Sequence, residues 1–414
     1  MQALRINAKR LWDSLMETAK FGATSNGGIT RLALTEEDQA VRDWFRAAAV
    51  DIGCTVTIDQ VGNMFARRSN RTTGFSPIAM GSHLDTQPRG GKFDGVLGVL
   101  GALEVMRTLQ EAAYETNAPV EIINWTNEEG TRFAPAMLAS GVFAGVFTTE
   151  FAHSRQDHEG KAFGAELQRI GYLGSETAGL HELVAMFELH IEQGPILGAE
   201  GRTIGVVTGV QGMRWYEVIV FGQQAHAGAT PMNLRKNALV GAARVIDAID
   251  AIARRFAPDA VATVGLIECC PNSRNTIPGE IFFTVDLRHP SDDVLGEMES
   301  QMRTVLRAIL EPLQLTFQEK CIWSSPTVAF DPKVIQCVTR GAEQAGDRAR
   351  CIVSGAGHDA AYIARVALTA MIFIPCLNGI SHSEAESATF EDCAAGTQVL
   401  LNAVLEFDAL LGSL

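Results

Sequence analysis

Short apolar runs alternate with segments of helical periodicity along most of the chain, and this alternation predicts an α/β fold. Residues 76–80, 120–125 and 185–192 are predicted to be buried strands, and residues 96–109 and 390–411 have the apolar spacing of helices. Ligands bind such sheets beyond the carboxyl ends of the strands. Polar residues at those strand ends are therefore the first candidates for a functional site.

The pattern changes between residues 213 and 325, where strand, helix, strand, strand, helix and strand follow one another. The predicted strands are 215–221, 260–268, 281–288 and 314–323, and the predicted helices are 233–255 and 291–310. This order is typical of a compact α+β sandwich inserted into the first domain. We therefore predict two domains, one formed by residues 1–211 and 326–414 and the other by residues 212–325.

The first polar cluster follows the strand at 76–80. The segment Gly81-Ser-His-Leu-Asp-Thr86, with Gly90-Gly-Lys-Phe-Asp-Gly95 after it, brings His83, Asp85 and Asp94 close together in the sequence. His83 and Asp85 share a face of an extended chain, so the Asp85 carboxylate could orient the imidazole of His83 while that ring binds a metal. A His-x-Asp sequence also occurs by chance and is weak evidence on its own.

Two adjacent acids, Glu128 and Glu129, follow the strand at 120–125. Adjacent carboxylates repel each other unless a cation or hydrogen bonds hold them. On a loop they are most often solvated, but near a His/Asp cluster they suggest a division of labour. One would bind a metal, and the other would act as a general base on water activated by the metal.

Two further histidines complete a set of candidate metal ligands. His190 lies at the end of the strand at 185–192, and His382 lies in a loop after an apolar strand at 368–374. Histidines in such places are often structural. Together, however, the candidates form a plausible site for a pair of cations, with Asp94 bridging and Glu128 free to accept a proton. The candidate ligands are His83, Asp94, Glu129, His190 and His382.

Composition narrows the class of protein. The formal net charge is −14 and no Lys/Arg-rich run occurs, which argues against a nucleic-acid partner. The chain lacks a run of eighteen uncharged apolar residues, so we expect no membrane-spanning helix, and the N-terminus does not resemble a signal peptide. The 8 cysteines form no Cys-x-x-Cys pair, as expected for reduced thiols in the cytoplasm.

Several motifs together resemble one known family. They are residues 81–98, Asn127-Glu-Glu-Gly-Thr-Arg-Phe133, His190-Ile-Glu-Gln-Gly-Pro195, residues 224–232, Pro271-Asn-Ser-Arg-Asn-Thr-Ile-Pro-Gly279 and Ser354-Gly-Ala-Gly-His-Asp-Ala360. The family is the hydantoinase/carbamoylase branch of the M20 metallopeptidase-like amidohydrolases, and the resemblance spans nearly the whole chain. This branch contains N-carbamoyl-L-amino acid hydrolases, β-ureidopropionases, and allantoate or ureidoglycolate amidohydrolases.

The resemblance implies a role for each candidate. One metal would be held by His83, Asp94 and His190, and a second by Asp94, Glu129 and His382, with Glu128 as general base and then acid. The inserted domain would be a lid and dimerisation domain, which implies a homodimer. His226 would stabilise the oxyanion, in its own site or in that of the partner subunit. The substrate carboxylate would be bound by Gln193, Asn275 and Arg288.

The chemistry of these side chains agrees with such roles, although each has an alternative. The guanidinium of Arg288 can bind a carboxylate through two hydrogen bonds, but it could instead form an ion pair with Asp286. His226, in a turn rich in Ala and Gly, could be a solvated histidine. His358 could line the substrate pocket or belong to a structural turn. Glu384 stands where the family often has Pro, and we expect its charge to affect pocket polarity.

The sequence therefore predicts an amidohydrolase with two divalent ions (Zn, Mn, Co or Ni) that cleaves the carbamoyl group of N-carbamoyl amino acids, of the L-α or β-alanine type. The products would be an amino acid, carbon dioxide and ammonia. Allantoate or ureidoglycolate amidohydrolase is the main alternative. A metallo-aminopeptidase or deacylase, or a non-catalytic binding protein, are more distant alternatives. The expected partner is a small ureido acid, with neither nucleic acid nor membrane.

Overall fold

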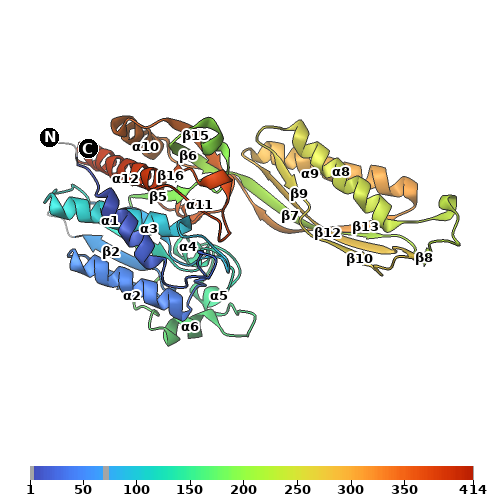
Figure 1. Ribbon diagram of the computed structural model, residues 1–414, viewed down its shortest axis with the longest axis horizontal. Helices are drawn as coiled ribbons and strands as arrows, with labels where there is room; N and C mark the ends of the chain where they lie inside the picture. The colour runs from blue at the N-terminus through green and yellow to red at the C-terminus, as the bar shows by residue number, and fades with distance from the viewer. Residues whose placement is uncertain (1–3, 69–73, 414) are drawn as a thin grey trace. The chain divides into compact units, whose positions relative to one another are not determined.

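The chain folds into two compact units (Figure 1). The computed structural model describes residues 4–68 and 74–413. One unit comprises the chain up to Gly209 together with the chain from Ala329 onward, and the other comprises Val210–Val328. The boundaries predicted from the sequence were residues 212 and 325.

A mixed sheet forms the centre of the first unit, in the order β1-β2-β4-β3-β5-β16-β6-β14, with β15 also paired with β6. The neighbouring strands β4, β3, β5 and β16 are parallel, so their carboxyl ends lie along the same edge. The strands are β1 (Thr55–Ile58), β2 (Met64–Arg68), β3 (Ile78–His83), β4 (Val120–Trp125), β5 (Ala185–Ile191), β6 (Ile204–Val210), β14 (Val328–Ala329), β15 (Ala349–Ser354) and β16 (Leu368–Ile374).

Helices pack around this sheet. They are α1 (Ala8–Thr18), α2 (Glu36–Asp51), α3 (Asp94–Glu111), α4 (Leu138–Phe143), α5 (Thr149–His153), α6 (Phe163–Arg169), α7 (Ile196–Glu200), α10 (Pro332–Ala345), α11 (Asp359–Ile363), α12 (Phe390–Leu411) and the short 3-10 turn η3 (Leu377–Gly379). α3 packs against β3, β5 and α12, and nearly all of its residues are buried. This packing fixes the start of α3 beside the carboxyl ends of the central strands.

α12 is long and apolar enough to cross a membrane by length and composition. It packs instead against α3, α10, β5 and β16, and 61% of its most apolar 18-residue window is buried in the protein. Thr389 caps its first turn by accepting a hydrogen bond from the amide of Asp392. We therefore interpret α12 as a core helix of the first unit.

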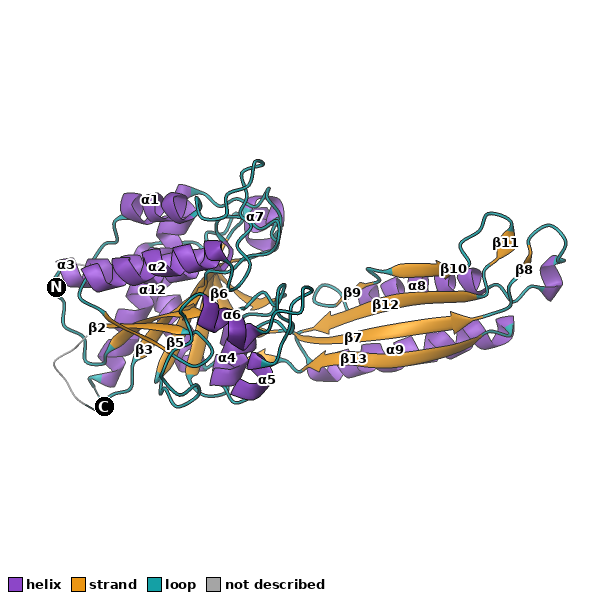
Figure 2. Cartoon of the chain, turned by 90° about the horizontal axis from the view of Figure 1, so that it is seen from below, coloured by secondary structure: helices purple, strands orange, loops and turns teal. Residues whose placement is uncertain are grey.

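The second unit is a two-layer α+β structure in which α8 and α9 cover one face of a sheet (Figure 2). The sheet order is β10-β12-β7-β13, with β9 also paired with β12, and β8 and β11 form a separate ribbon. The elements are β7 (Gly212–Phe221), β8 (Ala225–His226), η1 (Met232–Leu234), α8 (Ala238–Arg255), β9 (Val261–Thr263), β10 (Ile267–Cys270), β11 (Thr276–Ile277), β12 (Glu280–His289), α9 (Asp292–Leu310), η2 (Glu311–Leu313) and β13 (Thr316–Ser325).

The predicted fold class, a mixed α/β sheet with an inserted α+β unit, is confirmed. Two details differ. The strand predicted at 260–268 is two strands, β9 and β10, and the β8–β11 ribbon was not predicted. Strands of two residues carry no detectable periodicity, which explains why the sequence pattern did not reveal the ribbon.

Candidate metal centre and active site

The carboxyl ends of four neighbouring strands position the candidate residues. His83 is the last residue of β3, Glu128 and Glu129 follow β4, and His190 lies near the end of β5. The loop after β16 carries His382. Because these strands are parallel neighbours, side chains that are distant in the sequence converge at one edge of the sheet.

Asp94 lies at the centre of this convergence, as the first residue of α3. Its Oδ1 is 3.0 Å from Nε2 of His190 and 3.8 Å from Nε2 of His83. Its Oδ2 is 3.6 Å from Nε2 of His382, which in turn lies 3.6 Å from Oε2 of Glu129. The five side chains thus form two groups that share Asp94, with ligand atoms within 4.8 Å of one another in each group. The structure brings together all five predicted ligands.

The orientation of the imidazoles suits metal binding. Nδ1 of His83 lies 2.9 Å from the carbonyl oxygen of Asp85, and Nδ1 of His190 lies 2.9 Å from the carbonyl oxygen of Ile191. If each Nδ1–H donates to its carbonyl, each Nε2 presents a lone pair to the carboxylate of Asp94. Two acceptors facing each other require a proton or a cation between them. Oε1 of Glu129 is also buried without a hydrogen-bond partner, so the residues suit divalent ions.

A third group, Glu188 with His190 and His358, also has ligand atoms within 4.8 Å of one another. Both oxygens of Glu188 are already used, since Ser82 Oγ donates to one at 2.7 Å and the amide of Ala360 donates to the other at 3.1 Å. Glu188 is therefore satisfied as a structural acceptor, and the two groups around Asp94 remain the better metal positions.

Glu128 faces the ligands without belonging to either group. Its Oε2 lies 3.5 Å from Nε2 of His83, and its side chain is buried. Burial raises the pKa of Glu128 well above its ordinary value, and the neighbouring carboxylates of Asp359 and Glu129 raise it further. A buried carboxylate with a raised pKa beside a cation site is suited to moving a proton.

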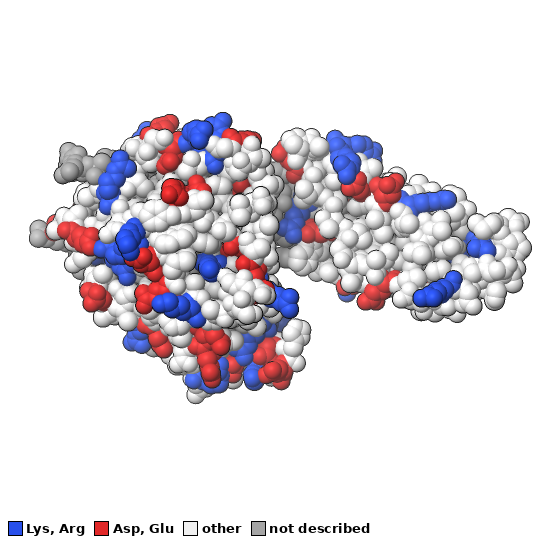
Figure 3. Space-filling view, viewed as in Figure 1, with Lys and Arg blue, Asp and Glu red and all other residues white. Residues whose placement is uncertain are grey.

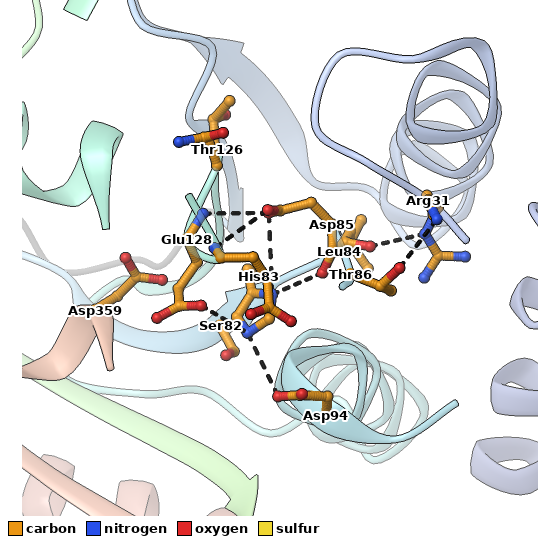
Figure 4. A network of polar contacts seen from close by, with 12 residues as sticks. Arg31, Ser82, His83, Leu84, Asp85, Thr86, Asp94, Thr126, Glu128 and Asp359 are labelled. Carbon is orange, nitrogen blue, oxygen red and sulfur yellow. Dashed lines mark hydrogen bonds and ion pairs between the residues drawn. The ribbon is translucent and has the colours of Figure 1, made fainter. Parts of the chain in front are cut away.

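The Asp85 carboxylate lies near the His83 ring (Figure 4) but does not make the hydrogen bond that was predicted for it. Its Oδ1 lies 3.9 Å from Nδ1 of His83, beyond hydrogen-bond distance, and the main-chain carbonyl of Asp85 orients the ring instead. The Asp85 carboxylate accepts hydrogen bonds from the amides of Glu128 and Glu129, each at 3.3 Å. Asp85 therefore positions the loop that carries both acids.

Gln193 lies among the ligands, as expected of a residue at the site. Its Nε2 is 3.4 Å from both oxygens of Asp94 and 3.3 Å from Nε2 of His382. Its Oε1 is buried without a partner, and its backbone is left-handed, with φ 57°. His358, by contrast, is buried behind His190, with ring centroids 4.5 Å apart, and its Nε2 contacts Ser354 Oγ at 3.0 Å. This geometry favours the structural alternative for His358.

The other predicted substrate residues belong to the second unit, where they lie apart. His226 pairs with Thr276 in the β8–β11 ribbon, and the amide of Ala227 donates to the carbonyl of Asn275 at 2.9 Å, so His226 and Asn275 are neighbours. Arg288 lies near the far end of β12, eight residues beyond Glu280, which corresponds to about 26 Å of strand. The structure does not bring Asn275 and Arg288 together within one chain.

Arg288 forms the ion pair with Asp286 that was predicted as its alternative role. Its Nη2 lies 2.7 Å from Oδ2 of Asp286, and its Nε also donates to that carboxylate. His226 is exposed, and its Nδ1 accepts from the amides of Gly228 and Ala229, each at 3.1 Å. Nε2 of His226 is the ring nitrogen left for a ligand.

Three supporting residues were not found from the sequence. Gln87 donates to Oε2 of Glu129 at 2.6 Å. The buried Arg31 donates to the carbonyl of Leu84 at 2.7 Å (Figure 4). Glu386 accepts a hydrogen bond from the amide of Asp94 at the start of α3. Each is joined to the site by the tertiary fold, so a single sequence carries no signal for it. Glu384, expected to alter the pocket, instead accepts hydrogen bonds from Thr24 and Asn26.

The fold and the clustered His and carboxylate side chains define an α/β protein with a candidate metal-binding centre. The model of peptidase family M20/M25/M40 matches residues 79–406, and the chain belongs to this family. An N-carbamoyl-L-amino-acid amidohydrolase of Rhizobium meliloti is 48% identical over 402 residues, covering 97% of each chain. The allantoate amidohydrolase of Escherichia coli (strain K12) is 31% identical over 393 residues, covering 94% of this chain and 95% of the relative.

Solved structures agree with this assignment. The crystal structure of an amidase of the hydantoinase/carbamoylase family from Burkholderia multivorans superposes with a TM-score of 0.95 at 55% identity. The match covers 97% of this chain and 98% of that one. The resemblance inferred from the sequence motifs is confirmed.

Proposed function

We propose that this protein is a dinuclear amidohydrolase that cleaves the carbamoyl group of N-carbamoyl-L-amino acids. In the reaction one water and one ureido acid give an amino acid, carbon dioxide and ammonia. The observation that carries the proposal is the placement of Asp94, whose two oxygens face different groups of ligands beside a separate acid, Glu128. The 48% identity to a relative named for this activity supports the choice of substrate.

The residues divide the work as follows. One ion would be held by His83, Asp94 and His190, and the other by Asp94, Glu129 and His382, a mixed set that accepts Zn, Mn, Co or Ni. Bound there, the ions would supply Lewis acidity that lowers the pKa of water and polarises the ureido carbonyl. Glu128 takes the proton of the attacking water on its carboxylate and then gives it to the leaving nitrogen of the amino acid.

Recognition of the substrate carboxylate would need two copies of the chain. Gln193 offers an amide at the metal centre, whereas Arg288 and the pair His226–Asn275 lie at opposite ends of the second unit's sheet. We propose a homodimer in which Arg288 comes from one chain, and Asn275 and the oxyanion donor His226 come from the other. Arg288 would share its guanidinium between Asp286 and the substrate.

The surface charges and the free thiols suit a cytoplasmic enzyme that acts on small carboxylic acids. On the face shown in Figure 3, Lys and Arg side chains are interspersed with Asp and Glu, which gives nucleic acid no continuous basic surface there. All 8 cysteines are free. Free thiols are typical of a reducing compartment, which supports a cytoplasmic location.

Glu128→Gln tests the proposal, because the amide has nearly the same size but cannot accept the water's proton. We expect the variant to fold, to keep its metal content, and to lose at least about a hundredfold in kcat. Replacement of the exposed Glu150 by Gln is the matched control and should leave kcat unchanged. Full activity of Glu128→Gln would refute the role of Glu128 as general base. If the protein is instead a non-catalytic binding protein, neither the wild type nor Glu128→Gln would show turnover.

A further inference from the structure

A single buried carboxylate, that of Glu386, joins the two segments that carry Asp94 and His382. Its Oε1 accepts hydrogen bonds from the amides of Phe93 and Asp94, at 3.2 and 3.1 Å. Its Oε2 accepts from the hydroxyl of Ser381 at 2.9 Å. Glu386 thus holds the N-terminus of α3 with one oxygen and the His382 loop with the other.

The neighbouring glycine leaves room for this carboxylate. A Cβ added at Gly91 would lie 2.2 Å from Oε1 of Glu386 and 2.4 Å from its Cβ. No side chain can therefore occupy position 91 while Glu386 keeps its place. Gly91 and Glu386 form one contact that two separate substitutions can break.

The two proposed ion positions depend on this contact to different degrees. His83 ends β3, His190 lies in β5 and Asp94 begins α3, so the first ion's ligands sit on regular elements. His382 lies in a loop with left-handed backbone (φ 53°), and its side chain is 51% exposed, against 5% or less for Asp94 and Glu129. The ion that needs His382 has the least constrained ligand.

We propose that Glu386 is a positioning residue that controls occupancy of the second ion, the one held by Asp94, Glu129 and His382. The inference rests on the proposed dinuclear function. Without Glu386, the His382 loop loses its link to the α3 amides and keeps a longer one, from Ser381 Oγ to Oδ2 of Asp94 at 3.5 Å. His382 is then held less firmly beside Asp94 and Glu129. The ion between His83, Asp94 and His190 keeps all its ligands.

Metal content measured together with metal affinity tests this inference on the full-length protein. The variants are Glu386→Ala, Glu386→Gln and Gly91→Ala. Glu384→Gln is the matched control, because this carboxylate lies two residues away on the same loop yet contacts Thr24 and Asn26. Each protein is loaded with Zn²⁺ and dialysed, the bound Zn²⁺ is counted, and its stepwise loss to a chelator is followed. Thermal unfolding shows whether each variant folds.

We expect Glu386→Ala and Gly91→Ala to keep one tightly bound ion and to hold the second about 10- to 100-fold more weakly, the usual effect of removing such support. Glu386→Gln should lie between them and the wild type, since its amide oxygen still accepts from the α3 amides. Excess Zn²⁺ should restore turnover of the variants, which a general loss of folding would not allow. Glu384→Gln should match the wild type.

Two outcomes would overturn the inference. In one, Glu386→Ala and Gly91→Ala hold both ions with wild-type affinity, and in the other both ions are lost together. If Glu386→Ala does not fold, Gly91→Ala and Glu386→Gln decide between these results. A wild-type protein that binds fewer than two ions would contradict the proposed function itself, which separates that failure from failure of the inference.

Discussion

The His83 ring contacts the backbone of Asp85 rather than its side chain, with Nδ1 of His83 2.9 Å from the carbonyl oxygen of Asp85. The Asp85 carboxylate is thereby left to bind the amides of Glu128 and Glu129. One residue thus orients a candidate metal ligand with its backbone and supports the acid pair with its side chain. The backbone contact survives substitution of Asp85, whereas the side-chain contacts do not.

Asp85→Ala should therefore impair catalysis more than it impairs metal binding at His83. The amides of Glu128 and Glu129 lose their acceptor, so both carboxylates become less well placed, and we expect kcat/KM to fall about 10- to 100-fold. Asp85→Asn keeps one acceptor oxygen and should fall less. Steady-state kinetics with parallel Zn²⁺ counting checks this, and unchanged kcat/KM in Asp85→Ala would show that the carboxylate has no such role.

Gly95→Ala should displace His83. A Cβ at Gly95 would lie 2.1 Å from Cδ2 of the His83 ring, so the ring must leave its place at the start of α3. We expect at least a tenfold weaker hold on the first ion. Gly296→Ala is a control within α9, where the nearest atom to the added Cβ is 4.0 Å away. Equal Zn²⁺ affinity of the two variants would contradict the observed packing of His83 on α3.

Metal binding should release protons, and the metal affinity should rise with pH. Burial tends to lower the pKa of His190, but the ion pair with Asp94 outweighs it and raises this pKa to about 9. Burial, followed by the charges of Asp94 and Asp85, raises the pKa of Glu129 well above its ordinary value. Near neutral pH both groups therefore hold protons that a cation must displace.

The metal affinity rises with pH because each proton is bound only by the metal-free form, which a lower pH therefore favours. For each proton released, the apparent affinity rises about tenfold per pH unit, up to the pKa of the group. Calorimetric titration with Zn²⁺ in buffers of different ionisation enthalpy measures the protons released. An affinity that is independent of pH below about 9, without proton release, would contradict this assignment of protonation.

Two inactive variants should complement each other when mixed. In the proposed dimer, His226 acts in the site whose base is Glu128 of the other chain. Mixed dimers of Glu128→Gln and His226→Ala then contain one intact site, and random exchange of subunits in a symmetric dimer restores about a quarter of wild-type activity. Activity that stays absent after verified subunit exchange would mean that each site is completed within one chain.

The sequence alone predicted this cluster of side chains because polar residues stand where apolar runs end. His83, Glu128 and Glu129 follow strands, so a parallel sheet had to bring them to one edge. The polar residues that hold the ligands in place could not be found this way. Glu386 contacts the amide of Asp94 across 292 residues of sequence, and the carbonyl that orients His83 leaves no trace in residue type.

The second unit shows another limit of sequence patterns. Its sandwich was predicted because β7, β12 and α9 are long enough to be periodic. The separation of Arg288 from Asn275 could not be predicted from the sequence. It arises because β12 runs away from the β8–β11 ribbon, so that Arg288, near the end of β12, lies far from Asn275. Residues that a family resemblance groups as one clamp can therefore lie at opposite ends of a sheet.

The most direct test of the central claim is ammonia release by metal-loaded protein from a panel of substrates. The panel contains several N-carbamoyl-L-amino acids, N-carbamoyl-β-alanine, allantoate and a dipeptide, and the dipeptide is followed by amino-acid release. We predict turnover of N-carbamoyl-L-amino acids, at rates that rise until two ions are bound per chain and collapse in Glu128→Gln. Turnover of allantoate or of the dipeptide alone, or full activity without metal, would contradict the proposed function.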